Sequence, residues 1–221
     1  MSKATIDLRA YNTYIVDMDG TLYFKRAMQL RMLFSLAGYY ITHPFKLKEL
    51  LILARYRKLR DKDDISENPE FEKIIAEELS KRFGVSEDRV RNIIRYWILQ
   101  KPLQILAACS DRKLQAFLAE RKAESCKFIV YSDYPAAEKC KAIGVQPDDV
   151  FWPDGERICV LKPSSAGVKY IVSQHNLDVS KTLFIGDRYE KDGVCAKNSG
   201  MDYLILKKSR FSRMRQYKHL F

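Results

Sequence analysis

The stretch YIVDMDGT, residues 14–21, decides the fold of this chain of 221 residues. Its apolar half predicts a buried strand, because short apolar runs that end in turn residues are typical of strands inside a sheet. The turn that follows carries the polar residues Asp17, Asp19, Gly20 and Thr21. Ligands of open parallel sheets bind beyond the carboxyl ends of the strands. If the sheet is parallel, both carboxylates therefore lie in its binding crevice.

The rest of the chain indicates an α/β protein with a helical insertion. At 25–102 apolar residues recur at helical spacing, and no strand is indicated. After residue 102, strands are predicted at 127–131, 150–152, 182–185 and 203–206. The helices between and before them begin near 110, 136, 165 and 193, with Ser110 as the cap of the first.

Strands that alternate with helices indicate a parallel sheet covered on both faces. We therefore expect a Rossmann-like α/β core made of residues 1–24 and 103–221. An all-helical cap domain is expected at 25–102. The basic and aromatic segment after residue 206 has no clear period, and we expect it to be solvated or frayed.

The two carboxylates of the first turn suit phosphoryl transfer. One carboxylate can attack phosphorus as a nucleophile, while the other protonates the leaving oxygen and later activates water. A solvated Asp-Gly turn is the alternative interpretation of the same residues, and such turns are common. A second acidic group elsewhere in the chain is needed to decide between the two.

That second group follows another apolar strand. Gly186 and Asp187 follow the strand predicted at 182–185, and Asp192 comes five residues after Asp187. Mg²⁺ prefers oxygen ligands and typically takes one or two carboxylates together with substrate phosphate and water. Carboxylates at two strand ends therefore predict a shared Mg²⁺ site. A helix start that merely carries acidic residues is the alternative.

Two further side chains complete a candidate phosphate pocket. Ser132 follows the strand at 127–131, where its hydroxyl can donate to a phosphoryl oxygen. Lys162 can neutralise the charge that spreads over that group in the transition state. Either residue alone is unremarkable, and their order between the two acidic turns is what makes them informative.

In this order the four motifs resemble those of the haloacid dehalogenase (HAD)-like superfamily, and carboxylates at both 17 and 19 resemble its phosphatase branch. The resemblance spans the chain apart from residues 25–102 and the basic tail. It implies that Asp17 is the nucleophile and forms an aspartyl-phosphate. It also implies that Asp19 is the general acid and base, and that Ser132 and Lys162 hold the phosphoryl group.

The resemblance also implies ligand sets. The Mg²⁺ site would consist of Asp17, Asp19 through its backbone carbonyl, Asp187 and Asp192. The phosphate site would use the nucleophile and the two residues that hold the phosphoryl group. It would also include Gly20, Thr21 and Asp133. Many members carry Asn or a small residue at the position of Asp133, so this chain departs from the pattern there.

The helices at 25–102 resemble the C1-type cap of the superfamily, which closes over the site and contacts the substrate. We therefore expect a phosphoric monoester hydrolase that acts on a small phosphorylated metabolite. A phosphomutase, which delivers the phosphoryl group to a sugar hydroxyl, needs the same residues and stays an alternative. No motif indicates the natural substrate or the oligomeric state. Arg188 is expected to pair with Glu190, with contact to an anionic substrate as the alternative.

The composition favours anionic partners, because the chain has 39 Lys and Arg but 28 Asp and Glu, which gives a net charge of +11. Basic residues gather at 25–62, where we expect an ordinary cap helix with its apolar face inward and its charges in water. The alternatives are an electropositive lid over the site and an amphipathic helix on an anionic membrane. In the second case the chain would be a weakly catalytic module that binds a membrane or another polyanion through its basic cap. For the basic tail, a solvated terminus is preferred over nucleic-acid binding.

The expected location is the cytoplasm. No run reaches the roughly 18–20 apolar residues that a membrane-spanning helix needs, and residues 1–14 show no apolar leader. The five cysteines have irregular spacing without a matching histidine cluster. Free thiols in a reducing compartment are therefore expected, not disulfides or a zinc site.

Overall fold

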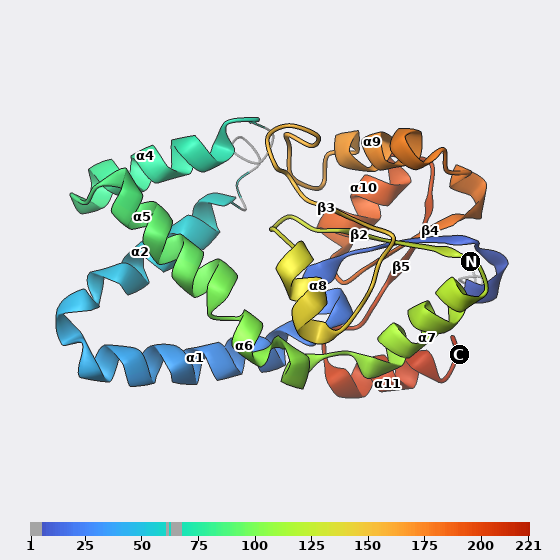
Figure 1. Cartoon of the computed structure of the whole chain (residues 1–221), viewed down its shortest axis with the longest axis horizontal. Helices are drawn as coiled ribbons and strands as arrows, with labels where there is room; N and C mark the ends of the chain where they lie inside the picture. The colour runs from blue at the N-terminus through green and yellow to red at the C-terminus, as the bar shows by residue number, and fades with distance from the viewer. Residues whose placement is uncertain (1–5, 61, 63–67) are drawn as a thin grey trace.

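The computed structural model describes residues 6–60, 62 and 68–221. A five-stranded sheet in the order β3–β2–β1–β4–β5 lies at its centre (Figure 1). The strands are β1 (Thr13–Val16), β2 (Lys127–Tyr131), β3 (Asp149–Phe151), β4 (Thr182–Gly186) and β5 (Asp202–Ile205). Every pairing is parallel. The predicted α/β class with a parallel sheet is confirmed.

Helices cover both faces of this sheet because its strands are apolar on both sides. Tyr14 and Val16 face a core that includes residues of α7 (Arg112–Ala123), α8 (Ala137–Ile143) and α11 (Arg210–Tyr217). Ile15 faces a second core with α9 (Ala166–His175) and α10 (Val194–Lys197). Since β1 is the middle strand and wholly buried, the turn after it lies at the centre of the carboxyl edge of the sheet.

A helical region follows β1 and lies beside the sheet (Figure 1). Its helices are α1 (Lys25–Thr42), α2 (Lys48–Arg60), α4 (Phe71–Phe83) and α5 (Glu87–Ile94), which continues into η4 (Arg95–Gln100). The region has an apolar core of its own, which includes Ile52, Leu59, Ile75, Leu79 and Trp97. Ser86 caps α5 by accepting a hydrogen bond from the backbone N of Arg89. The short helix α6 (Leu103–Leu106) leads back to the sheet.

Two expectations about local structure are wrong. The helix α7 is capped by Asp111 and not by Ser110, because the Asp111 carboxylate accepts a hydrogen bond from the backbone N of Leu114 at 3.3 Å. The tail is not frayed within the described residues, since it forms α11, in which Arg213 and Tyr217 are buried. Asp111 takes part in both corrections, because its carboxylate also forms a buried ion pair with Arg213 that ties the tail to α7.

The five cysteines are free thiols, as expected. Across residues 6–60, 62 and 68–221, no helix combines the length and the apolar character needed to cross a membrane. Residues 1–5, where the sequence shows no apolar leader, lie outside the described part of the chain, as does Asp61 in the basic cluster.

Candidate active site

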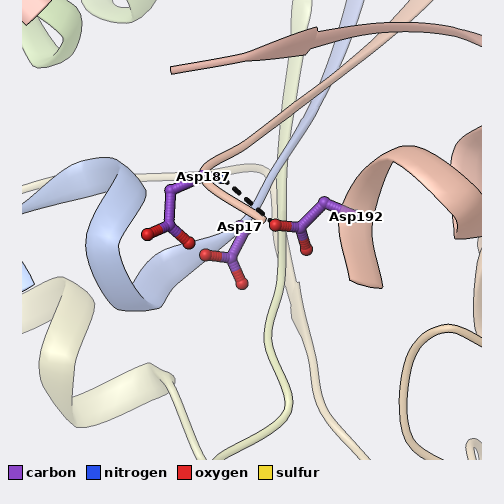
Figure 2. A group of neighbouring side chains, drawn as sticks. All are labelled: Asp17, Asp187 and Asp192. Atoms are coloured by element: carbon purple, nitrogen blue, oxygen red, sulfur yellow. Dashed lines mark hydrogen bonds between the residues drawn. The ribbon is translucent and has the colours of Figure 1, made fainter. Parts of the chain in front are cut away.

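Three carboxylates meet at the carboxyl edge of the sheet (Figure 2). Asp17 follows β1, Asp187 follows β4, and Asp192 lies in the turn η7 (Tyr189–Gly193). Oxygen atoms of the three lie within 4.8 Å of one another, and all three residues are buried. The parallel pairing of β1 with β4 brings the two acidic turns together, as the sequence predicts.

Lys162 bridges two of these carboxylates. Its Nζ lies 2.6 Å from Asp17 Oδ1 and 2.6 Å from Asp192 Oδ1, and the lysine is 1% exposed. Burial alone would lower the pKa of this ammonium, but Asp17 and Asp192 outweigh it and hold the pKa well above its usual value. The ammonium of Lys162 thus neutralises part of the charge of the carboxyl groups that meet here.

The group of three carboxylates fits a divalent cation. Asp187 Oδ1 is buried and has no hydrogen-bond partner among the described residues, which is costly for a carboxylate unless a ligand takes the oxygen. The turns are also shaped closely around the carboxylates. A Cβ atom at Gly20 would lie 2.5 Å from Asp187 Oδ2, and one at Gly186 would lie 2.4 Å from the Asp192 carboxyl group. An all-oxygen donor set of this kind suits Mg²⁺.

The loop after Asp17 is held by its own residues. Thr21 donates a hydrogen bond from Oγ1 to Asp17 Oδ2 at 3.1 Å, which leaves Asp17 fixed by Thr21 on one oxygen and by Lys162 on the other. Gly20 has a φ of 102°, a conformation that favours glycine. The close approach of Asp187 excludes a side chain at Gly20 as well.

The structure also places Ser132 and Asp133 at the site, at the end of β2. Ser132 is fully buried, and its Oγ accepts a hydrogen bond from the backbone N of Tyr134 at 3.2 Å. Asp133 Oδ1 accepts a hydrogen bond from the backbone N of Lys162 at 3.0 Å. The Asp133 carboxylate therefore supports the loop that carries Lys162. Its predicted contact with phosphate stays a prediction.

Asp19 is held by a partner that sequence reasoning missed. Lys139, on α8, lies 2.7 Å from Asp19 Oδ1 and 2.8 Å from Oδ2, and Tyr23 donates its hydroxyl to the same carboxylate. Burial acts to raise the pKa of Asp19, but the Lys139 ammonium outweighs it and lowers the pKa to about 2. Asp19 is therefore ionised at neutral pH. In the structure Asp19, the predicted general acid and base, is therefore in its deprotonated form, which can accept a proton.

Replacement of Lys139 by Met is expected to raise the pKa of Asp19, because the main cation that stabilises its carboxylate is lost while the carboxyl group stays buried. The pKa can be measured by a ¹³C NMR titration of the carboxyl group, assigned with the variant Asp19→Asn. Lys141→Met, on the same helix, is the control, since Lys141 pairs with the exposed Glu138 and not with Asp19. An unchanged pKa in Lys139→Met would contradict this role.

Arg213 is the second residue that the sequence did not reveal. Its guanidinium is fully buried and donates to the backbone oxygens of Gly20 at 2.6 Å and Thr21 at 3.1 Å. It also pairs with Asp111 at 3.1 Å, and Tyr217 donates its hydroxyl to the same carboxylate at 2.7 Å. The basic tail thus fixes the loop after Asp17 through its backbone oxygens.

A cavity of about 240 Å³ opens over the site. Its floor includes Asp17, Asp19, Lys162, Asp187 and Asp192, and its other side is formed by the helical region through Met28, Met32, Arg57 and Trp97. Arg188 also lines it, and its Nε lies 2.9 Å from Glu190 Oε1, so the expected ion pair is present. This volume lies just below the range of about 300–1,000 Å³ that is typical of drug-sized ligands, so the cavity suits a smaller molecule.

Known proteins resemble this chain in sequence and in fold. The HAD-hydrolase-like family model matches residues 160–218, which include Lys162, Asp187 and Asp192. No curated protein matches the chain. The 2-haloacid dehalogenase from Pseudomonas syringae pv. tomato DC3000 is similar over 89% of this chain and 86% of its own, with a TM-score of 0.62 and 16% identity.

Two further structures have the same fold. A protein from Haemophilus somnus 129pt, assigned as a phosphoglycolate phosphatase, covers 95% of this chain and 92% of its own, with a TM-score of 0.55 and 15% identity. YfnB from Bacillus subtilis, described as a HAD-hydrolase and bound to magnesium, is similar over 89% of this chain and 86% of its own, with a TM-score of 0.53 and 16% identity. At these identities the likeness shows the fold, and with the family match it confirms the resemblance to the HAD-like superfamily.

Proposed function

We propose that this chain, whose fold is that of the HAD-like hydrolases, is a magnesium-dependent phosphatase that hydrolyses a small phosphate monoester. The observation that carries the proposal is the joint placement of Asp17, Lys162, Asp187 and Asp192 at one edge of the sheet. A buried nucleophile, a buried cation and an unpartnered carboxylate oxygen are the elements that phosphoryl transfer requires.

Asp17 is proposed as the nucleophile. Its Oδ attacks phosphorus in line with the leaving oxygen, the ester P–O bond breaks, and an aspartyl-phosphate forms. Water then attacks phosphorus, the acyl phosphate P–O bond breaks, and inorganic phosphate leaves. Lys162 neutralises part of the negative charge on the transferred group, and Ser132 can donate its hydroxyl to an equatorial oxygen.

Mg²⁺, when bound by Asp17, Asp187, Asp192 and the backbone carbonyl of Asp19, supplies charge neutralisation at the phosphoryl oxygens. Asp19 is proposed to give a proton to the leaving oxygen and to take one from water in the second step. In the structure it has the form that takes a proton, because Lys139 keeps it ionised. A bound phosphate dianion favours the protonated form of a neighbouring carboxyl group by like-charge repulsion, which the first step needs.

The helices at 25–102 are proposed as the cap that selects the substrate. They contribute apolar and cationic groups to the cavity, among them Met32, Arg57 and Trp97, and Arg60 donates from Nη2 to the backbone oxygen of Asp133 at 2.5 Å. The cap thus contacts the loop beside Ser132. A cavity of about 240 Å³ with cationic walls suits a small anionic ester.

The direct test is phosphate release from a panel of phosphorylated metabolites by the purified protein with Mg²⁺. We expect multiple turnovers on at least one small monoester and none with EDTA. Turnover that depends on an added sugar bisphosphate would identify the phosphomutase alternative instead. The absence of Mg²⁺-dependent turnover on any phosphoester would overturn both enzymatic proposals.

Magnesium is expected to stabilise the folded protein, because the cation reduces the repulsion among the carboxylates of Asp17, Asp187 and Asp192. At a concentration of about one hundred times its Kd, the gain is about 2.7 kcal/mol, which corresponds to a rise in Tm of roughly 5–10 °C. Burial raises the pKa of Asp17, so protons compete with the cation and the rise in Tm should increase with pH. Thermal denaturation at two pH values measures both effects. Asp187→Asn should remove most of the shift, and a shift unchanged in that variant would place the cation elsewhere.

A further inference from the structure

We infer that the hairpin formed by α1, the turn η3 (Pro44–Lys46) and α2 docks on the surface of an anionic lipid bilayer. The hairpin carries an uncovered apolar surface, here called the outer face. It consists of Leu30, Leu33, Phe34, Ile41, Phe45, Leu47 and Leu51. Seven of the twelve large apolar side chains that are exposed among the described residues lie in this one segment, so the exposure is concentrated and not scattered.

The helix α1 has two apolar faces. One packs into the core of the helical region, and the other belongs to the outer face. Met32 and Tyr40 of the same helix are instead buried in the core of the helical region. Leu30, Leu33, Phe34 and Ile41 follow the spacing of a single helical stripe. A surface helix in water needs only one apolar stripe. The sequence favoured such an ordinary cap helix, with its apolar face inward, and α1 differs from it by carrying an apolar stripe on each side.

The turn at the end of the hairpin is the most exposed part of this face. Phe45 is 100% exposed and Ile41 is 79% exposed. In Figure 1 the turn between α1 and α2 lies at the end of the molecule away from the sheet. A projecting apolar tip suits shallow insertion into a lipid surface, where aromatic and aliphatic side chains leave water without needing a shaped pocket.

The charge around the outer face is positive. Arg26, Arg31, Lys48 and Lys58 are exposed on the same two helices. Glu49 is the sole acidic residue at 25–60, and it is buried and paired with Arg89. Each basic side chain near an anionic bilayer adds to the attraction, while the apolar side chains insert between the headgroups.

The positive charge also favours lipid over a second copy of the chain. A symmetric dimer through this face would bring the same basic residues of both copies together, and like charges across an interface repel. An anionic bilayer meets both the apolar side chains and the cations. The docking does not depend on catalysis, because none of the seven residues of the outer face lines the cavity over Asp17.

Vesicle sedimentation tests the inference on the full chain. We expect the protein to sediment with vesicles that contain phosphatidylserine in phosphatidylcholine, to bind far less to phosphatidylcholine alone, and to bind more weakly as salt is raised. The double variant Ile41→Ser with Phe45→Ser should lose affinity for the anionic vesicles by at least about tenfold, since two inserted apolar side chains are removed. Because both side chains are exposed, its Tm should match that of the unchanged protein.

Phe211→Ser is the matched control, because Phe211 is 73% exposed on α11 and outside the hairpin. It should bind vesicles like the unchanged protein. No binding to anionic vesicles at low salt, or equal binding by the double variant, would overturn the inference. So would a dimer in analytical ultracentrifugation that the double variant abolishes without any vesicle binding, since that would assign the outer face to a second copy.

Discussion

Replacement of Asp17 by asparagine is expected to lower turnover by roughly 10⁴–10⁶-fold, because an amide oxygen is too weak a nucleophile to form the acyl phosphate. The fold should survive. Burial already raises the pKa of Asp17, so a neutral side chain is compatible with its surroundings. Lys162 keeps Asp192 as its second partner, at 2.6 Å. Phosphate release and thermal denaturation of the same preparation measure the two effects.

Asp88→Asn is the control for this variant, because Asp88 is exposed in the first turn of α5, remote in sequence from the acidic turns. Its turnover should equal that of the unchanged protein. Retained turnover in Asp17→Asn, with Mg²⁺ present, would refute the assignment of the nucleophile. Loss of turnover together with a collapsed Tm would show a structural role for Asp17.

Replacement of Arg213 by methionine is expected to destabilise the fold by about 3–5 kcal/mol, because it leaves the Asp111 carboxylate buried without its cation. Arg213 is 0% exposed and Asp111 is 1% exposed, so water cannot replace the lost partner. The backbone oxygens of Gly20 and Thr21 lose their donor as well. Urea denaturation measures the loss in free energy of unfolding. Turnover should fall too, since the loop after Asp17 loses its support.

Two further variants separate the buried charge from the other contacts. Arg215→Met, at an exposed position of the same helix, should change the free energy of unfolding by less than about 0.5 kcal/mol. Asp111→Leu combined with Arg213→Met should recover part of the loss, because the unpaired carboxylate is gone. If Arg213→Met is as stable as Arg215→Met, the ion pair is not what holds the tail.

The placement of the candidate site residues could be predicted from the sequence because their motifs are local. Asp17, Asp187 and Ser132 each follow an apolar strand directly, so their place at the carboxyl edge follows once the strands are known to be parallel. The sheet then brings them together without any further information. The strands and most helices were predictable for the same reason, since their apolar periods are clear within a few residues.

The supporting residues could not be predicted, because their roles depend on contacts between distant segments. Lys139 looks like any basic residue of an amphipathic helix, and only the packing of α8 against the first turn brings it to Asp19. Arg213 lies 192 residues after Thr21 in the chain, within a run of other basic residues. Apolar residues on α1 indicate burial, but the sequence does not say that one stripe would stay uncovered.

Chemical trapping of the phosphorylated enzyme tests the central claim most directly. The protein is mixed with Mg²⁺ and a monoester that it turns over, quenched in acid and reduced with borohydride, which converts an acyl phosphate to an alcohol. We predict that peptide mass spectrometry will find homoserine at position 17, and only when substrate and Mg²⁺ were both present. Phosphate release under the same conditions without any homoserine at position 17 would contradict a covalent role for Asp17.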